Sequence, residues 1–338
     1  VLAELGAAFL FFLAGYHIEP RSLRGADGRR AGLTWVIAAL LAFVLSLTMT
    51  SLGIVSATAP VAIALSTTAV GALIPILKDA DLQATVVGRT TLAIGAFGEL
   101  GPIILLSLLL SGRSPVTALF ALLGFALAAI VIWGLNVRAP QWLTRLVLKG
   151  RWTNAQTPIR WVLLLLLALT FVAVDSGAEF VLGAFVGGQI LRLLLPAGDR
   201  HIETVMEGIG YGWFIPLYFI VSGASLDVVA ITERPLVPVV LMLVMLAVHS
   251  MAVIIMYWGR ETRRERVSVA LFTTTALPLV VASTAVAVKS GIMPSDTAAL
   301  LVGAALLTML IMPVLGRISA RPESPDNLGE LPEFDRPY

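Results

Sequence analysis

Long hydrophobic runs separated by short polar connections dominate the chain. Apolar runs of about 17 residues or more, with few charges, are long enough to cross a bilayer as helices. Because most connections are short, we expect the helices to pack as one membrane domain over residues 1–316. The pattern predicts about eleven spanning helices, at residues 1–18, 31–53, 55–77, 84–111, 115–137, 159–175, 180–196, 210–231, 235–258, 266–289 and 295–316.

Two segments depart from this pattern. Residues 138–158 mix apolar Trp142 and Leu146 with basic Arg145 and Lys149, which is typical of an amphipathic helix lying on the membrane surface. The tail, residues 317–338, is rich in proline and acidic residues, and we expect it to be disordered.

Composition and charge support a membrane protein. Of the 338 residues, 58% are hydrophobic and 13% are charged, against about 25% charged in a typical soluble domain. A cytosolic enzyme, a nucleic-acid binder and a disordered protein are excluded on this ground. The chain has no cysteine, which excludes disulfides and thiolate zinc sites. The fold class predicted is an all-α polytopic membrane protein.

Basic residues predict an orientation. With alternate connections placed on opposite sides of the membrane, 20 of the 23 lysines and arginines fall on one side. The positive-inside rule makes that side, and the C-terminus, cytoplasmic. The chain opens at Val1 directly inside a span, which suggests an N-terminal truncation with further helices upstream.

Two polar stretches inside predicted spans form an internal repeat. Residues 64–70 read ALSTTAV and residues 270–277 read ALFTTTAL, with Pro75 and Pro278 shortly after each hydroxyl cluster. The two spans are seven apart, so the copies cross the membrane in opposite senses. Inverted repeats with paired interrupted helices indicate a secondary transporter with a site near the midplane. The alternative is that these hydroxyls bond back to their own helices or serve as small packing residues.

Two ionisable residues fall near the middle of predicted spans: Glu99 in the fourth and His249 in the ninth. A charge at that depth costs roughly 2.5 kcal/mol or more, so a functional role is the first hypothesis. A proton or an alkali cation arriving at Glu99 relieves the same cost. Glu99 is therefore the candidate proton and transient cation site, and His249 is its possible charge partner. Their alternatives are a glutamate satisfied by a hydroxyl and a hydrogen-bonded core histidine.

Oxygen ligands for such a cation could come from several neighbours. The hydroxyls of Ser66, Thr67 and Thr68 are the first candidates, together with carbonyls freed where the helices break. Thr274, Thr275 and Pro278 mark the second broken helix. We find no metal-ligand spacing and no phosphate-binding loop, so ATP-driven pumping is not expected.

Motifs spread along the chain resemble the bacterial monovalent cation:proton antiporters of the sodium/proton exchanger superfamily. They are LAELG at 2–6, FLAG at 12–15, ALSTTA at 64–69, LGAFVGG at 182–188 and YGWFIPLYFIVSG at 211–223, in family order. In this resemblance Glu99 falls where the family has its essential aspartate, and His249 falls where many members have lysine or arginine. Glu99, His249 and Gly98, where the family usually has a polar residue, are departures from the pattern.

The resemblance implies an inverted-repeat antiporter fold with two crossing broken helices, in a homodimer that works by elevator-type alternating access. The mobile core would comprise residues 31–111 and 235–316, the scaffold and dimer helices 1–18 and 159–231, and the linker 115–158. Relative to the family's thirteen helices, the first two are absent. The resemblance also implies a bacterial inner membrane, surrounding lipid and no cofactor.

The sequence therefore predicts a transporter, not an enzyme, that exchanges Na⁺ or K⁺ for protons at Glu99. A single carboxylate favours electroneutral one-for-one exchange. The alternative is a carrier of the same fold that moves a small organic anion at helix N-termini. An intramembrane serine protease using Ser222 and His249 is a third class, but nothing in the sequence positions that pair or an oxyanion hole.

Overall fold

A computed structural model describes residues 2–17, 25–109, 157–175, 180–194, 200–224 and 227–320, and every regular element within them is a helix. The predicted span 115–137, most of the predicted linker 115–158 and residues 321–338 of the tail lie outside the described residues. The all-helical class predicted from the sequence is confirmed for the part of the chain that is described. The number of membrane crossings stays a prediction.

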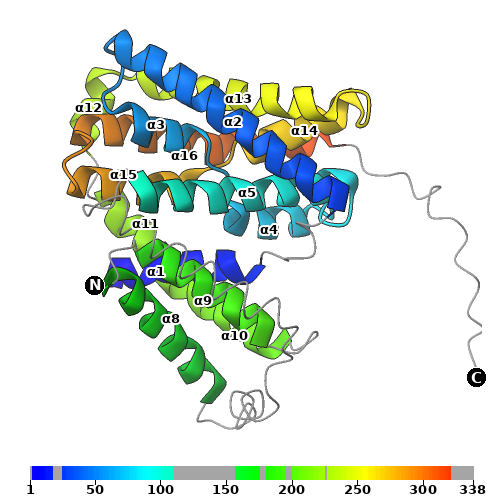
Figure 1. Cartoon of the computed structure of the whole chain (residues 1–338), viewed down its shortest axis with the longest axis vertical. Helices are drawn as coiled ribbons and strands as arrows, with labels where there is room; N and C mark the ends of the chain where they lie inside the picture. The colour runs from blue at the N-terminus through cyan, green and yellow to red at the C-terminus, as the bar shows by residue number, and fades with distance from the viewer. Residues whose placement is uncertain are drawn as a thin grey trace, which may run out of the picture.

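One group of helices forms the larger part of the molecule, in the upper half of Figure 1. α2 lies across α3, α5 and α13, while α14 and α15 pack on α16. The members of this group are α2 (Gly25–Ser51), α3 (Thr58–Leu65), α4 (Val70–Asp79), α5 (Val86–Leu109), α12 (Val228–Glu233), α13 (Leu236–Tyr257), α14 (Arg263–Thr273), α15 (Leu277–Lys289) and α16 (Ser295–Ser319).

A second group lies below it in Figure 1. Its helices are α1 (Leu2–His17), α8 (Thr157–Asp175), α9 (Phe180–Leu194), α10 (Arg200–Ile209), a π-helical turn η1 (Gly210–Phe214) and α11 (Ile215–Ala224). α1 and α9 pack closely against each other. A Cβ at Gly15 would collide with the Phe185 carbonyl, and one at Gly188 with the Phe12 carbonyl. Glycine at both positions therefore lets the two backbones touch.

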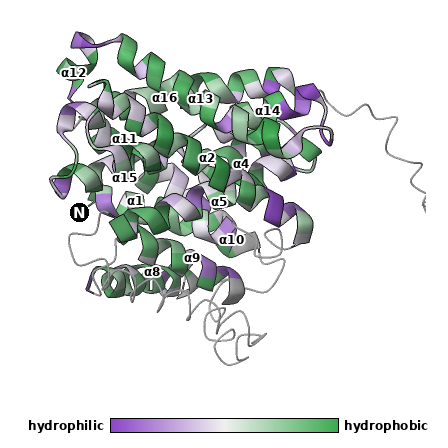
Figure 2. Ribbon diagram, turned by 45° about the horizontal axis from the view of Figure 1, so that its top comes forward, coloured by the Kyte–Doolittle hydropathy of each residue, from purple (hydrophilic) through white to green (hydrophobic). Residues whose placement is uncertain are grey.

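The exposed surface suits lipid. Among the described residues, seven helices or broken helix pairs are long and apolar enough to span a membrane, and α1 and most of α9 are shorter apolar stretches. Large apolar side chains such as Leu40, Phe43 and Phe171 are exposed on α2 and α8. The ribbon in Figure 2 is coloured as hydrophobic along much of the helices, while strongly hydrophilic residues gather towards helix ends. Such broad apolar surface in a folded chain marks a membrane-facing protein.

The two spans that carry the repeat are interrupted, as predicted. The first divides into α3 and α4, and the second into α14 and α15, with non-helical backbone at residues 66–69 and 274–276. These broken spans are the most buried of the candidate spans. Interrupted backbone at membrane depth is tolerated where protein surrounds it, which is its position here.

The span predicted at 210–231 is misplaced. The helix begins ten residues earlier, at Arg200, continues through η1 and ends at Ala224. The predicted start of this span is too late because the charges of Glu203 and Glu207 interrupt the apolar run in the first turns of the helix. The predicted end is too late because Asp227 starts a separate helix, α12, by accepting a hydrogen bond from the Ala230 N–H at 3.2 Å. The C-terminal span also continues to Ser319, three residues into the predicted tail.

Candidate ion-binding site

The two helix breaks meet in the interior. The Ala69 N–H donates to the Thr275 carbonyl at 2.8 Å, and the Thr68 hydroxyl donates to the Thr273 carbonyl at 2.6 Å. The repeats therefore supply each other's missing backbone partners at the point where their own helices stop. A buried carbonyl or N–H without a partner is costly, so these cross-bonds hold the two breaks together.

Proline residues free the carbonyls that tie the first break to its surroundings. Pro102 has no N–H to offer the Gly98 carbonyl four residues earlier, and that carbonyl accepts from the Thr68 N–H at 2.9 Å. Pro75 likewise leaves the Gly71 carbonyl free, and Tyr211 of η1 donates its hydroxyl to it at 2.8 Å. Each proline thus leaves a helix carbonyl free to bond with a different segment of the chain.

Most hydroxyls of the repeat bond back to their own helices. Ser66 donates to the Ile63 carbonyl at 3.0 Å, Thr67 to Ala64 at 2.9 Å and Thr274 to Ala270 at 2.7 Å. This is the packing arrangement that the sequence left open as the alternative. A hydroxyl that donates its proton still has oxygen lone pairs for a cation, so these residues remain available as ligands. Thr275 is also buried, and its Oγ1 has no hydrogen-bond partner.

Glu99 is buried beside the first break. Its side chain is 2% exposed and within hydrogen-bonding reach of the Val70 backbone N–H, the first residue of α4. Its Oε2 has no hydrogen-bond partner. A helix N-terminus carries a partial positive charge, which favours a carboxylate at this place. One carboxylate oxygen is held by α4, and the other is left without a protein donor.

Small residues on α5 bring Glu99 close to the break. A Cβ at Gly95 would approach the Val70 side chain to 2.6 Å, and one at Gly98 would approach the Thr68 Cβ and Oγ1 to 2.8 Å. A larger side chain at position 98 would not fit against Thr68 in this arrangement. Glycine at position 98 lets the unwound segment pack closely against α5.

His249 faces the opposite helix end. Its ring, 2% exposed, is within hydrogen-bonding reach of the Leu65 and Thr67 carbonyls, where α3 stops, and Nε2 has no partner. A helix C-terminus carries a partial negative charge and unpaired carbonyls, which favour an N–H donor or a cation. Glu99 therefore lies at a helix end with a partial positive charge and His249 at one with a partial negative charge, on the two sides of the same break. Pro278, the second residue of α15, starts that helix after the other break.

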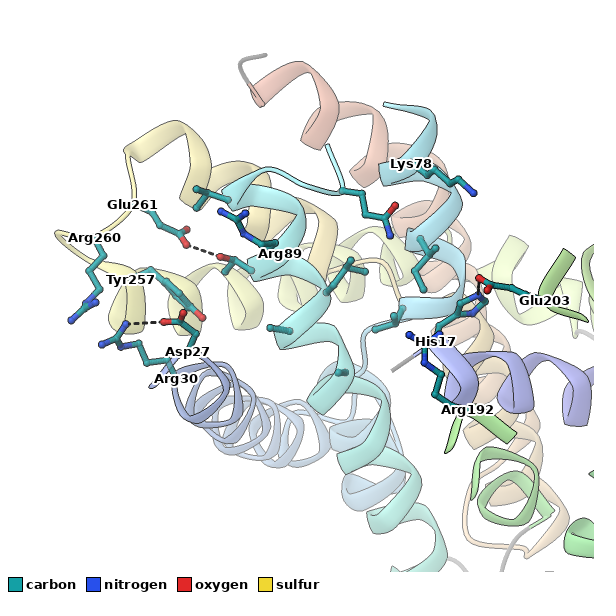
Figure 3. Close-up of a pocket in the computed structure, with 18 of the residues that line it drawn as sticks. His17, Asp27, Arg30, Lys78, Arg89, Arg192, Glu203, Tyr257, Arg260 and Glu261 are labelled. Carbon is teal, nitrogen blue, oxygen red and sulfur yellow. Dashed lines mark hydrogen bonds and ion pairs between the residues drawn. The ribbon is translucent and has the colours of Figure 1, made fainter. Parts of the chain in front are cut away.

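A cavity of about 870 Å³ leads towards this site. Its lining includes Val70, whose N–H faces Glu99, and Ala96, one turn before Glu99 on α5. Its lining also includes Glu207 and the charged residues labelled in Figure 3: Arg30, Lys78, Arg89, Arg192, Arg260, Asp27, Glu203 and Glu261. All five of these basic residues belong to the set that the charge distribution places on one side of the membrane.

Glu261 lies at the edge of this cavity, between α13 and α14. The Thr90 hydroxyl donates to Oε1 at 2.8 Å, whereas Oε2 is buried without a partner. Burial raises the pKa of this carboxyl, and the charge of Glu265 adds to the rise; the Thr90 bond and Arg266 act in the opposite direction.

This raised pKa predicts a pH dependence of stability. The folded chain holds the Glu261 proton more tightly than the unfolded chain, so stability falls as the pH rises from about 4.3, the ordinary value of glutamate, through the folded value. Glu261→Gln should remove this contribution and flatten the decline of the thermal midpoint in that pH range. Asp27→Asn, which alters an exposed carboxylate of the same cavity, is the control and should keep the wild-type decline. Equal slopes in Glu261→Gln and wild type would contradict the assignment.

The sequence did not single out several residues of the cavity as functional. His17, Glu203, Glu207 and Glu261 fell at predicted span ends or in connections, where charges are ordinary. One signal was present: Glu203 and Glu207 are four residues apart and would share a face of any helix that included them. The sequence could not show what that face meets.

These features define a multi-pass membrane protein in which two crossed, broken helices enclose a buried carboxylate. Residues 1–318 match the family model described as sodium/hydrogen exchanger, transmembrane. The chain therefore belongs to the sodium/hydrogen exchanger family, which confirms the family expected from its motifs.

Two relatives support this family assignment. The chain is 24% identical over 345 residues to “Putative Na(+)/H(+) antiporter YjbQ” of Bacillus subtilis (strain 168), covering 96% of this chain and 55% of that protein. It is 29% identical over 262 residues to the glutathione-regulated potassium-efflux system protein KefC of Shigella flexneri serotype 5b (strain 8401), covering 71% of this chain and 39% of that protein. The chain thus spans about half, or less, of the length of these relatives.

The structure of the sodium proton antiporter MjNhaP1 from Methanocaldococcus jannaschii matches with a TM-score of 0.60 at 15% identity, over 94% of this chain and 82% of that one. This likeness confirms the antiporter-like fold. The relatives are named as transporters, which agrees with the prediction that the chain is not an enzyme.

Proposed function

We propose that the chain exchanges a monovalent cation, Na⁺ or K⁺, for protons, with Glu99 as the shared site. The observation that carries the proposal is a buried carboxylate at the crossing of two helix breaks, with one oxygen facing the α4 N-terminus and the other without a partner. A carboxylate in this position must bind a proton or a cation to offset desolvation. The hydroxyl oxygens of Ser66, Thr67 and Thr68 are the proposed additional ligands of the cation.

The cavity is the proposed cytoplasmic entrance. It runs from basic residues that the positive-inside rule assigns to the cytoplasm towards Val70 and Ala96 beside Glu99. On the same basis we place the C-terminus in the cytoplasm, and we propose a bacterial inner membrane. Exchange at one carboxylate needs no cofactor.

We further propose that the two helix groups move relative to each other. The group of α1 and α8–α11 would act as the scaffold and homodimer surface, and the group containing both breaks would move past it. Tyr211 on the scaffold side and the Gly71 carbonyl on the other would part during that motion, since their hydrogen bond joins the two groups.

An organic-anion carrier is the weaker alternative. It would use the positive N-termini of α4 and α15 to hold the anion. The Glu99 carboxyl already faces the α4 N-terminus, and its charge would repel an incoming anion.

A cation panel in proteoliposomes tests the proposal. Na⁺, K⁺ or Li⁺ added against a preformed proton gradient should dissipate that gradient. Because one carboxylate would carry one charge in either direction, the rate should not change with membrane potential, although 100 mV is worth about 2.3 kcal/mol per net charge moved. A gradient unchanged by every cation, but dissipated by an organic anion, would favour the alternative.

His249 should tune the pH dependence of this exchange. His249→Gln keeps an N–H donor for the Leu65 and Thr67 carbonyls but cannot take up a proton, so the pH profile should shift while stability is largely kept. His249→Ala should shift the profile as well and also lower stability by about 1–3 kcal/mol, because it leaves buried carbonyls without a donor. A Gln variant with the wild-type pH profile would assign His249 a purely structural role.

A further inference from the structure

Three potential metal ligands converge on the opposite side of the cavity from Glu261. His17 is the last residue of α1, and Glu203 and Glu207 lie one turn apart on the same face of α10. The His17 Nε2 lies 2.9 Å from Glu207 Oε1 and 3.9 Å from Glu203 Oε1. One donor atom from each residue lies within 4.8 Å of the other two. His17 and Glu203 point towards each other in Figure 3.

The cluster combines burial with access to ions. The His17 side chain is 8% exposed, and its Nδ1 has no hydrogen-bond partner. Each glutamate side chain is 33% exposed, and all three residues line the cavity. The two carboxylates repel each other at this separation, so a cation between them is favoured. The proposed exchange at Glu99 makes no use of this cluster.

We propose that His17, Glu203 and Glu207 bind a divalent transition-metal ion of the Zn²⁺ class. Imidazole nitrogen with two carboxylate oxygens is a donor set found at zinc sites, with bonds of about 2.0–2.2 Å. Tetrahedral ligands at those bond lengths are about 3.4 Å apart. The two distances to His17 Nε2, 2.9 and 3.9 Å, lie on either side of that value, and all three donor atoms lie within 4.8 Å of one another. Side-chain adjustments would bring them to a common centre. A fourth position would open towards the cavity.

The donor types also set the selectivity. Alkali ions and Mg²⁺ prefer oxygen ligands, whereas the imidazole favours zinc and its neighbours. The transported ion would therefore not compete effectively at this cluster. Lys78 interacts electrostatically with Glu207, and Arg192 stacks over the Tyr16 ring at 5.4 Å. These two positively charged side chains lie near the cluster, so a bound metal ion would either displace them or bind beside them.

Metal binding would replace the hydrogen bond between His17 Nε2 and Glu207 Oε1. Protons compete with Zn²⁺ for such ligand atoms, so binding should weaken at acid pH. The ion would tie the end of α1 to the start of the α10–α11 helix. This inference concerns binding to the protein itself and does not depend on the proposed exchange activity.

Calorimetric titration of the purified full chain with ZnCl₂ tests the site. The protein should be prepared without a histidine tag. We expect one saturable Zn²⁺ per chain, unaffected by excess Na⁺ or Mg²⁺, with a higher thermal midpoint when it is bound. His17→Gln and Glu207→Gln should each weaken binding at least about tenfold. Asp27→Asn, which removes an exposed carboxylate of the same cavity, should bind as the wild type does.

If a variant fails to fold, a spectroscopic measurement on the wild type still tests the site. X-ray absorption of the Zn²⁺-loaded chain should show one imidazole ligand and otherwise oxygen ligands. Absence of saturable Zn²⁺ binding, an all-oxygen coordination shell, or equal affinity in a folded His17→Gln variant would overturn the proposal.

Discussion

Glu99→Gln should reduce cation:proton exchange to the level of protein-free vesicles while the chain still folds. Glutamine is close to glutamate in size and can accept the same Val70 N–H, so packing at the break is kept. It cannot bind a proton reversibly in the physiological pH range, and its neutral oxygen does not compensate a cation. The measurement is the rate of proton release from proteoliposomes on addition of Na⁺ or K⁺, with the thermal midpoint as the check on folding.

Two comparisons sharpen this experiment. Glu261→Gln removes a half-buried carboxyl from the cavity without touching the crossing, so it should retain exchange. Glu99→Asp keeps the charge on a shorter side chain, so it should retain part of the activity. Exchange by Glu99→Gln at the wild-type rate would remove Glu99 from the mechanism. An unfolded Glu99→Gln alongside an active Glu99→Asp would show instead that the carboxyl is needed for stability.

Much of the fold was predictable, because the information was local and periodic. Hydrophobic runs indicated where helices lie, and the hydroxyl-rich repeats at 64–70 and 270–277 indicated which two are broken. That the two broken helices cross was implied by the resemblance to the antiporter family, and it agrees with the rule that interrupted backbone in a membrane must find partners in protein. The structure adds the partners: Ala69 with Thr275, and Thr68 with Thr273 and Gly98.

The candidate site was only partly predictable. A lone acid in an apolar run made Glu99 visible, and its burial is as expected. The direction of the hydroxyls was not predictable, because Ser66 and Thr67 can bond within their helix or across it with similar ease, and only tertiary packing decides. The cluster of His17, Glu203 and Glu207 depends on how the end of α1 meets α10. His17 and Glu207 are 190 positions apart, and no local pattern exists for such a contact.

Gly98→Ala should destabilise the chain and sharply reduce exchange. The added Cβ would lie 2.8 Å from the Thr68 Cβ and Oγ1 and 3.3 Å from the Thr68 backbone nitrogen. Thr68 cannot turn aside easily, because its hydroxyl is bonded to the Thr273 carbonyl and its N–H to the Gly98 carbonyl. Overpacking of this kind costs about 1–3 kcal/mol, more than the gain of about 1 kcal/mol from replacing glycine by alanine in a helix. Relief of the clash must move α5 away from the break, and Glu99, the next residue, moves with it.

Gly208→Ala is the matched control for this variant. Gly208 is also helical, on α10, and a Cβ there meets nothing within 4 Å. The same substitution should therefore keep exchange and leave the thermal midpoint equal or slightly raised, since only the helix propensity changes. A lowered midpoint and lost exchange in Gly98→Ala, with neither change in Gly208→Ala, would tie transport to the contact between α5 and the unwound segment. If Gly98→Ala matched Gly208→Ala in both measurements, Glu99 would not owe its position to that contact, and the geometry proposed for the cation site would be wrong.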